Sequence, residues 1–203
     1  MLVEGNLKAK LPGSRSHPWT CAELNISEVY VDFKIHPEKI EETLEDYQTI
    51  TDEPAAEKFY GLLRYLNGPD SHLETSDCAL GQYKKNDNNL FDKGFQRSGR
   101  LMVLYKDLEL NVIEQYTTWL QEALLFHLKK VDTEFEYGFI ELSFMNTDFV
   151  TLNPVKSGKT VVIDFWAFGN SENDILKNLE RLFIALCLGL KNINKEIKIS
   201  SGS

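Results

Sequence analysis

The chain has 203 residues, and its 31 acidic and 22 basic side chains give a formal net charge of −9 at pH 7. Hydrophobic residues make up 42% and charged residues 26%, a balance that excludes collagen-like and strongly disordered chains. The length suits a single domain over residues 1–203. The acidic balance argues against a general nucleic-acid binder, because neutralising phosphates requires clustered Lys and Arg.

The apolar runs and the cysteines indicate the cellular compartment of the protein. The first ten residues lack the apolar core of a secretory signal. The longest apolar run, Leu182–Leu190, is about half the length that spans a bilayer and favours a buried helix. Cys21, Cys78 and Cys187 are odd in number and form no CxxC pair, which supports neither a zinc site nor a disulfide framework. We therefore expect a cytoplasmic protein with no membrane anchor, no metal and no cofactor.

The first third of the chain predicts two strands and two helices. Alternating apolar and polar residues predict a short edge strand at 7–11 and a half-buried strand at 29–35. A helix is expected over 37–47, with acidic residues in the first turn, where the helix dipole favours them. A second helix should begin near Asp52 and end before the breaker sequence 67–69.

In the middle of the chain, strands are expected at 73–80 and 100–106. The polar segment 82–98 between them is rich in Asn, Asp and Lys and predicts a long loop. Asn111 with Glu114 three residues later resembles a capping box, which predicts the start of a helix. The apolar face of that helix is expected to carry Ile113, Tyr116, Leu120, Leu124, His127 and Val131.

The last third predicts two covered strands and a helix. Residues 135–145 and 160–168 are apolar on both faces, as expected of central strands. Ser171 is expected to cap a helix that runs to Leu190, and residues 197–199 suggest a terminal strand. The element order indicates an α+β fold, in which helices pack on a mixed or largely antiparallel sheet within one domain. A pair of ferredoxin-like units is one topology that this order allows.

The motifs of the common enzyme classes are missing from the sequence. Residues 157–160 (SGKT) resemble the end of a phosphate-binding loop, but the apolar residues 161–163 that follow predict a strand rather than a helix. We therefore interpret 157–160 as part of a hairpin turn. The sequence contains no GxGxxG, GxSxG or HExxH pattern, so no catalytic residue is assigned.

Three polar residues are candidates for a buried or pocket position. Asp164 lies in an apolar strand, where a carboxylate must be hydrogen-bonded, paired or protonated. It could serve as an acid in a site, or face an arginine such as Arg100 or Arg181. His127 lies on the expected apolar helix face, and Asp77 belongs to a polar segment that also contains a histidine and a cysteine. The purely structural interpretation of His127 is a histidine at the boundary of the core. For the segment that contains Asp77, it is a turn followed by a short strand.

Most of the excess negative charge lies in one segment. Residues 38–57 contain eight acidic residues and one basic residue, Lys39, for a net charge of −7. The acids at i, i+3 and i+4 spacing share one helix face. That face is either a docking surface for a basic partner or a solvated face that keeps the protein soluble. The candidate partner-binding residues are Glu38, Glu41, Glu42, Glu45 and Asp46.

These observations favour a small acidic interaction protein that binds and neutralises or regulates a protein partner. A toxin-immunity protein is the most concrete example. The alternative is an enzyme or small-molecule-binding protein outside the common motif classes, with a site around Asp164 and His127. The partner is expected to be a protein with a basic surface, not a membrane or a nucleic acid. The sequence also allows a homodimer.

Overall fold

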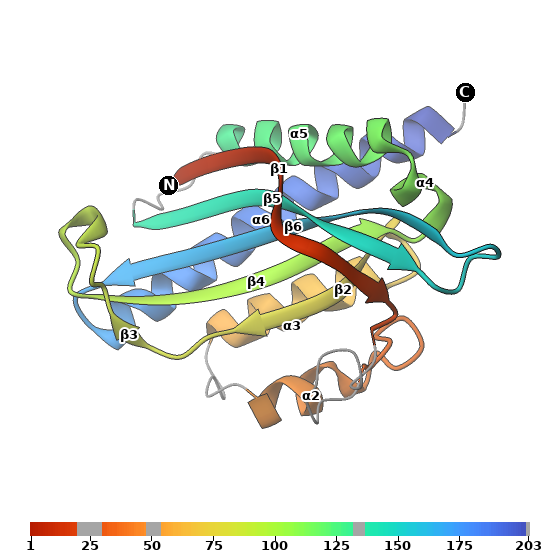
Figure 1. The fold of residues 1–203 in the computed structure, drawn as a ribbon. Helices are drawn as coiled ribbons and strands as arrows, with labels where there is room; N and C mark the ends of the chain where they lie inside the picture. Colours follow the sequence, from red (N-terminus) through yellow and green to blue (C-terminus); the bar gives the residue numbers. More distant parts are fainter. Residues whose placement is uncertain (20–29, 48–53, 132–136, 202–203) are drawn as a thin grey trace.

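The computed structural model describes residues 1–19, 30–47, 54–131 and 137–201. They form an α+β fold in which helices pack on a mixed sheet (Figure 1). In chain order the elements are β1 (Leu2–His17), α2 (Lys39–Tyr47), α3 (Pro54–Asn67), β2 (Leu73–Leu80), β3 (Lys84–Lys85), the 3-10 turn η1 (Leu90–Asp92), β4 (Phe95–Tyr105), α4 (Leu108–Val112), α5 (Glu114–Lys130), β5 (Gly138–Phe149), β6 (Lys156–Gly169) and α6 (Glu172–Ser201).

The described strands form one sheet in the order β1-β5-β6-β4-β2, with the short β3 paired to β4. β1 runs parallel to β5, and the other pairs are antiparallel. The expected mixed, largely antiparallel sheet is therefore confirmed. Ferredoxin-like units are not evident in this order, because they place their parallel neighbours inside the sheet, whereas the parallel pair here lies at one edge.

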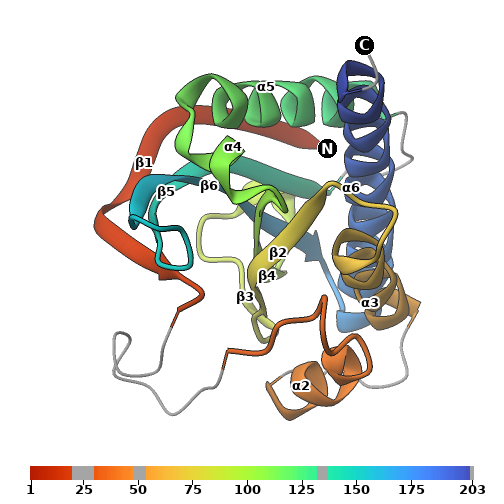
Figure 2. The same ribbon diagram turned by 90° about the vertical axis from the view of Figure 1, so that its right-hand side faces the viewer.

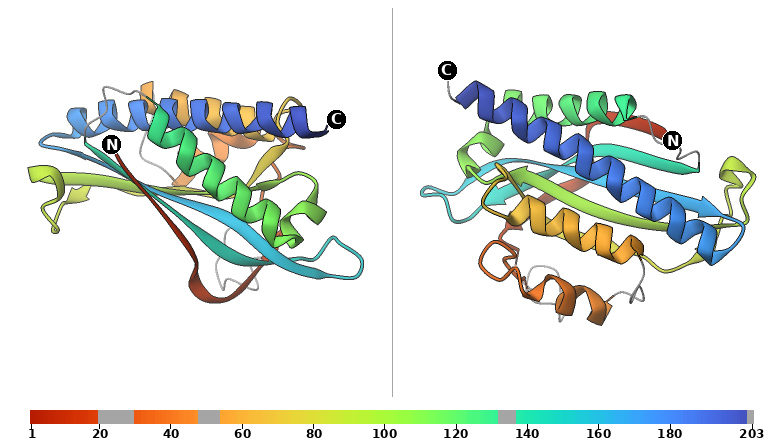
Figure 3. Two further views of the ribbon diagram at one scale, coloured as in Figure 1. Left: turned by 90° about the horizontal axis from the view of Figure 1, so that it is seen from above. Right: turned by 180° about the vertical axis from the view of Figure 1, so that it is seen from behind.

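The long helices α3, α5 and α6 cover one face of the sheet, and α6 crosses it between the other two (Figure 3). The core lies in this layer. The rings of Phe59 on α3, Phe165 on β6 and Phe183 on α6 meet there, with centroids 4.8 to 6.4 Å apart. In the part of the chain that the structure describes, no helix is long and apolar enough to cross a membrane.

The second face of the sheet is not covered by the long helices, but the sheet curls there (Figure 2). Met102, Met145 and Val162 form a separate buried cluster on this face. At one end, the two edge strands β1 and β2 meet through side chains. Arg15 Nη1 lies 2.6 Å from Asp77 Oδ2, and a short way after β1 the chain again contacts β2.

That second contact also protects the edge of β2. Trp19 Nε1 donates a hydrogen bond to the carbonyl oxygen of Ser76, at 3.1 Å. The backbone N–H of Thr75 donates to Asn67 Oδ1 at 3.2 Å. Because side chains occupy these backbone groups, they are not available to pair with a strand of another chain.

One predicted strand is wrong. In the segment 29–35, residue 29 lies outside the described residues, and residues 33–35 form a turn rather than a strand. Asp32 Oδ1 accepts from the backbone N–H of Lys34 at 2.9 Å, and the Asp32 carbonyl accepts from the N–H of His36 at 2.9 Å. Such local hydrogen bonds compete with the backbone pairing of a sheet. The alternation of apolar and polar residues, from which the strand was predicted, does not reveal them.

The predicted capping box is also wrong. Asn111 is buried within α4, where its Oδ1 accepts from the Tyr105 N–H and its Nδ2 donates to the Tyr105 carbonyl, both at 2.9 Å. Asp107 caps α4 instead, by accepting from the Glu109 N–H at 3.2 Å. Asn111 therefore joins α4 to the end of β4, and α5 begins separately at Glu114.

Two further boundaries differ from the prediction. The expected loop 82–98 contains β3 and η1, and β4 already begins at Phe95. The predicted terminal strand at 197–199 is wrong, because α6 continues to Ser201. The end of α6 packs on the protein: Asn194 is buried and its Oδ1 accepts from the His72 N–H at 2.8 Å. The start of α6 is as predicted, since Ser171 Oγ accepts from the Asp174 N–H at 3.2 Å.

Candidate functional site

The predicted acidic face lies at α2, beside α3 at the border of the molecule (Figure 1). Glu38, Glu41 and Glu42 are exposed there. Glu45 and Asp46 belong to the same helix, but their side chains lie outside the described ones. The structure therefore places the five acids in one segment, and solvent reaches the three whose side chains it describes.

Two of these acids have partners within the chain. Glu41 forms an ion pair with Arg64 on α3. Glu38 Oε1 lies 3.2 Å from His36 Nδ1. A hydrogen bond from its own backbone N–H, followed by the contact with His36, holds the pKa of Glu38 below its usual value. The ion pair of Glu41 with Arg64 therefore offsets part of the charge that α2 presents to a partner.

The structure places Asp77 and Asp164 on the curled face of the sheet, on either side of Arg100. Arg100 Nη2 donates to Asp77 Oδ2 at 2.7 Å, and Arg100 lies directly opposite Asp164 in the β4–β6 register. Of the two arginines proposed to face Asp164, Arg100 is therefore its neighbour. Arg181 is exposed on α6, in the helical layer.

His127 does not join this group. It lies on α5, where its Nε2 is 2.9 Å from Glu196 Oε1 on α6. Asp164 alternates with Ile163 and Phe165, which are buried under the helices, so its side chain points to the other face of the sheet. A single site built from Asp164 and His127 is therefore not formed.

The sequence reasoning missed a second charged cluster on the curled face. Glu74 and His17 are 1% and 4% exposed, and His17 Nε2 lies 3.4 Å from Glu74 Oε1. Lys34 Nζ lies 2.6 Å from Glu74 Oε2 and balances its charge. Burial, with smaller contributions from the carboxylates of Asp32 and Glu74, raises the pKa of the nearby Tyr30 hydroxyl.

Between these two charged groups lies a small cavity with room for one water molecule, about 10 Å³. Among its described lining atoms, Arg15 Nε, His17 Nδ1 and Ser76 Oγ are buried without a hydrogen-bond partner. The cavity is far smaller than the several hundred Å³ of a typical ligand pocket. The charged groups on this face therefore join the two edges of the sheet and do not line a substrate cleft.

Neither a nucleophilic cysteine nor a metal site emerges around residues 70–80. Burial raises the pKa of the Cys78 thiol to about 12, which keeps it protonated and poorly nucleophilic. His72 is exposed. Among the described residues, no three His, Cys, Asp or Glu side chains lie close enough to hold a metal ion.

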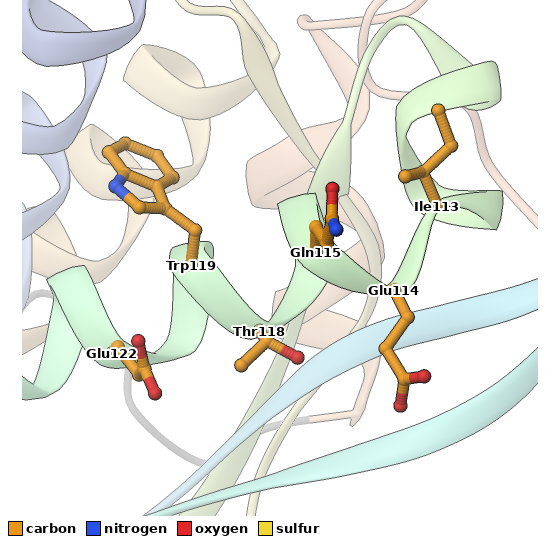
Figure 4. Close-up of a pocket in the computed structure, with 6 residues that line it drawn as sticks. All are labelled: Ile113, Glu114, Gln115, Thr118, Trp119 and Glu122. Atoms are coloured by element: carbon orange, nitrogen blue, oxygen red, sulfur yellow. The ribbon is translucent and has the colours of Figure 1, made fainter.

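A larger and more open feature is a shallow hollow on the surface along the first half of α5, lined by residues of this helix and by Ile113 just before it (Figure 4). Its volume is about 620 Å³. It contains two large apolar side chains, Ile113 and Trp119, which are 43% and 36% exposed. We call it the α5 groove, and its lining residues are Ile113, Glu114, Gln115, Thr118, Trp119 and Glu122.

The outer side of α5 carries two further exposed aromatic residues. Tyr116 is 46% exposed and Phe126 is 51% exposed. The spacing of apolar residues predicted Tyr116 and Ile113 on the buried face of this helix, and that prediction is wrong. The residues of α5 that the structure buries are Thr117, Leu120, Gln121, Leu124 and Leu128.

Hydrogen bonds explain why two polar residues replace aromatic ones on the buried side. Gln121 Nε2 donates to the Asn6 carbonyl on β1 at 2.9 Å. Thr117 Oγ1 donates to the Glu114 carbonyl at 3.0 Å. Because both polar groups are satisfied, their burial is tolerated, and the helix turns its aromatic side outward. Apolar residues on both sides of the predicted helix were the signal that could have revealed this surface.

The α5 groove is acidic. Its described lining residues include two carboxylates, Glu114 and Glu122, and no basic side chain. Outside the lining, Lys159 Nζ on β6 lies 2.5 Å from Glu114 Oε1. This lysine holds the pKa of Glu114 below its usual value. Both carboxylates are exposed, so the groove offers apolar contact next to negative charge.

Comparison with known proteins gives no match to a family model, to a curated protein or to a solved structure.

Proposed function

We propose that this protein binds a basic protein partner and that the α5 groove, with the aromatic residues beside it, is the contact surface. The observation that supports this is the exposure of Tyr116, Trp119 and Phe126 on one helix. Exposed apolar patches mark interaction sites, and tyrosine, tryptophan and phenylalanine are enriched in protein interfaces.

Charge supports a basic partner. The chain has a net charge of −9, and Glu114 and Glu122 lie in the groove itself. The exposed carboxylates at α2, Glu38 and Glu42 among them, add to a field that attracts a basic protein and raises its association rate. A toxin-immunity protein, which neutralises a partner by covering its surface, is the most concrete form of this proposal.

A cytoplasmic location is part of the proposal. Cys78 and Cys187 are both free thiols, as is usual where thiols are kept reduced. The alternative of an enzyme receives no comparable support, since Asp164 and His127 lie on opposite sides of the sheet and the cavity beside Asp77 holds about one water molecule.

Site-specific cross-linking in the native cell tests the proposal. A photo-reactive amino acid replaces Thr118 in the groove, and in a second sample it replaces the exposed Lys58 on α3. We expect one basic protein to cross-link to position 118 and not to position 58, as read by mass spectrometry. Equal labelling at both positions, or labelling of a second copy of this chain alone, would contradict the proposal.

The purified partner then allows a quantitative test. Trp119→Ala should weaken binding by at least about 10-fold, as expected for a central aromatic contact. Glu122→Lys should weaken binding most at low salt, whereas Glu57→Lys on the exposed side of α3 should have little effect. Circular dichroism confirms that each variant is folded. Unchanged affinity of Trp119→Ala and Glu122→Lys would refute the groove as the contact surface.

A further inference from the structure

The outward-facing apolar residues of α5 follow a regular spacing. Tyr116, Trp119, Ala123 and Phe126 are separated by three, four and three residues. Tyr116, Trp119 and Phe126 are among the exposed large apolar residues, and Ala123 is partly buried. We call these four residues the α5 seam. On an α-helix this spacing brings side chains into one line parallel to the helix axis.

The seam has the shape that a second helix requires. Alternating spacings of three and four residues are the pattern by which helices pack side by side at a shallow angle. α5 is 17 residues long, about 25 Å at 1.5 Å per residue. A helix laid along it would therefore contact about three turns.

Ala123 is the small residue of the seam, and it also packs against the core. Its methyl side chain lies between the large rings of Trp119 and Phe126, one turn away on either side. In packed helices, a small residue between large ones accepts an apolar side chain of the facing helix. We therefore expect the facing helix to place an apolar side chain at this point.

The charges along α5 give the partner an orientation. Glu122 lies at the middle of the helix, Glu114 at its start is paired with Lys159, and Lys129 and Lys130 lie at its end. Lys130 Nζ sits 3.8 Å from the centre of the Phe126 ring, which keeps positive charge at that end of the seam. A facing helix is therefore attracted most strongly with its basic residues next to Glu122.

We propose that the element of the partner that binds the α5 seam is an amphipathic helix, with apolar residues spaced by three and four and with basic residues in the half that lies over Glu122 and the start of α5, away from Lys129 and Lys130. This inference rests on the proposed function and adds the kind of structure that is recognised. Helix-in-groove binding is a common mode of protein recognition.

Synthetic peptides test the inference directly. The probe is a fluorescent 18-residue peptide with leucines at three- and four-residue spacing and with Lys and Arg at one end. Its matched control has the same composition in an order that breaks the spacing. We expect the probe to bind at least about 10-fold more tightly than the control in fluorescence anisotropy, and to gain helical circular dichroism on binding. Equal binding of both peptides would overturn the inference.

Variants locate the binding on the seam. Ala123→Glu, which places a charge in the middle of the seam, should lower the affinity for the probe at least about 10-fold, and Lys58→Glu on α3 should not. A probe with its charged residues moved to the other end should bind more weakly to the wild type. Unchanged binding of the probe to Ala123→Glu would show that it does not use the seam.

The outcomes separate this inference from the proposed function. If the cellular partner cross-links at position 118 through a strand or a loop, as mapped by mass spectrometry of the linked peptides, the proposed function stands and the helix is refuted. If position 118 captures no partner and the probe does not bind, both are refuted. A cross-link to a helical segment of the partner, abolished by Ala123→Glu, supports both.

Discussion

Asp77 receives hydrogen bonds from two guanidinium groups through one carboxylate oxygen, Oδ2. Its side chain is 12% exposed, and those of Arg15 and Arg100 are 18% and 39% exposed. Hydrogen bonds between ionised groups are among the strongest in proteins, and partial burial protects them from screening by salt. Asp77 therefore links the edge strand β1 to the paired strands β2 and β4 through side chains.

Asp148 carries a prediction about pH. The hydroxyls of Ser14 and Ser157 both donate to its carboxylate, that of Ser157 at 2.6 Å, and they lower its pKa. A carboxylate with a lowered pKa stabilises the fold above its unfolded-state pKa of about 3.9, and this contribution is lost as the pH falls through its folded-state pKa. Ser157→Ala should therefore destabilise the protein at pH 7, by less than about 1 kcal/mol because the pair is exposed.

The difference between Ser157→Ala and the wild type should shrink as the pH is lowered below about 4. Urea unfolding at a series of pH values measures it, and NMR titration of the Asp148 carboxyl shows the accompanying rise in its pKa. Thr151→Ala, in the exposed turn that follows β5, is the matched control. A difference that is constant with pH would contradict the assignment of these hydroxyls to Asp148.

Cys78 carries a prediction about reactivity. With its pKa raised to about 12, only about one thiol in 10⁴ is ionised at pH 8. Iodoacetamide at pH 8 should therefore alkylate Cys78 at least about 100-fold more slowly in the native protein than in urea. Mass spectrometry of the Cys78 peptide gives both rates. Comparable rates in the two states would show that the thiol is not held in its protonated form.

Among the elements, β6 and α4 come so close that only a glycine fits between them. A side chain on Gly158 would place its Cβ 2.2 Å from the Asn111 carbonyl oxygen of α4. The backbone of α4 cannot yield easily, because Asn111 is itself hydrogen-bonded to Tyr105. Gly61 on α3 is the opposite case, since its missing side chain would meet no atom within 4 Å.

Two glycine substitutions should therefore have opposite effects. Gly61→Ala should stabilise the protein by about 0.5–1 kcal/mol, because alanine loses less backbone entropy than glycine in a helix. Gly158→Ala should destabilise it by about 1–3 kcal/mol through the clash with α4. Urea unfolding with an unchanged slope measures both. Equal shifts of the two variants would show that the space around these positions is not as described.

In the molecule as a whole, the two edge strands β1 and β2 are farthest apart in strand order and yet share contacts. A double-mutant cycle of Arg15→Ala and Asp77→Ala should therefore give a coupling free energy of about 0.5–3 kcal/mol, the range for residues in one ion-pair network. The same cycle with Asp70→Ala, an exposed acid before β2, should give almost none. Vanishing coupling between Arg15 and Asp77 would mean that the sheet does not curl far enough to join its edges.

Local patterns predicted much of this fold, and contacts between distant residues explain where they failed. The strand at 73–80 and the helix start at Ser171 follow from residues close in sequence and agree with the structure. The pairing of Arg15 with Asp77 joins residues 62 positions apart, and no local pattern reports it. The hydrogen bond of the buried Gln121 to the Asn6 carbonyl likewise joins residues 115 positions apart.

The candidate sites, too, were predictable only where residues close in sequence define them. Composition alone located the acidic segment 38–57, and an isolated carboxylate in an apolar strand drew attention to Asp164. Neither observation revealed the α5 groove, because assigning faces from hydrophobicity presumes that aromatic residues point inward. Here satisfied polar groups at Thr117 and Gln121 occupy the inner side of the helix.

The parallel pairing of β1 with β5 has a consequence for synthesis on the ribosome. β1 emerges more than a hundred residues before β5, yet Leu2 pairs with Phe139 and His17 with Phe149. At about 5–20 residues per second, β1 waits on the order of 10 s before its partner strand exists. The helices and hairpins between them can form in far less time. The pairing of β1 at the sheet edge therefore forms only after β5 has been synthesised. In a truncated chain that ends before β5, β1 has no strand to pair with.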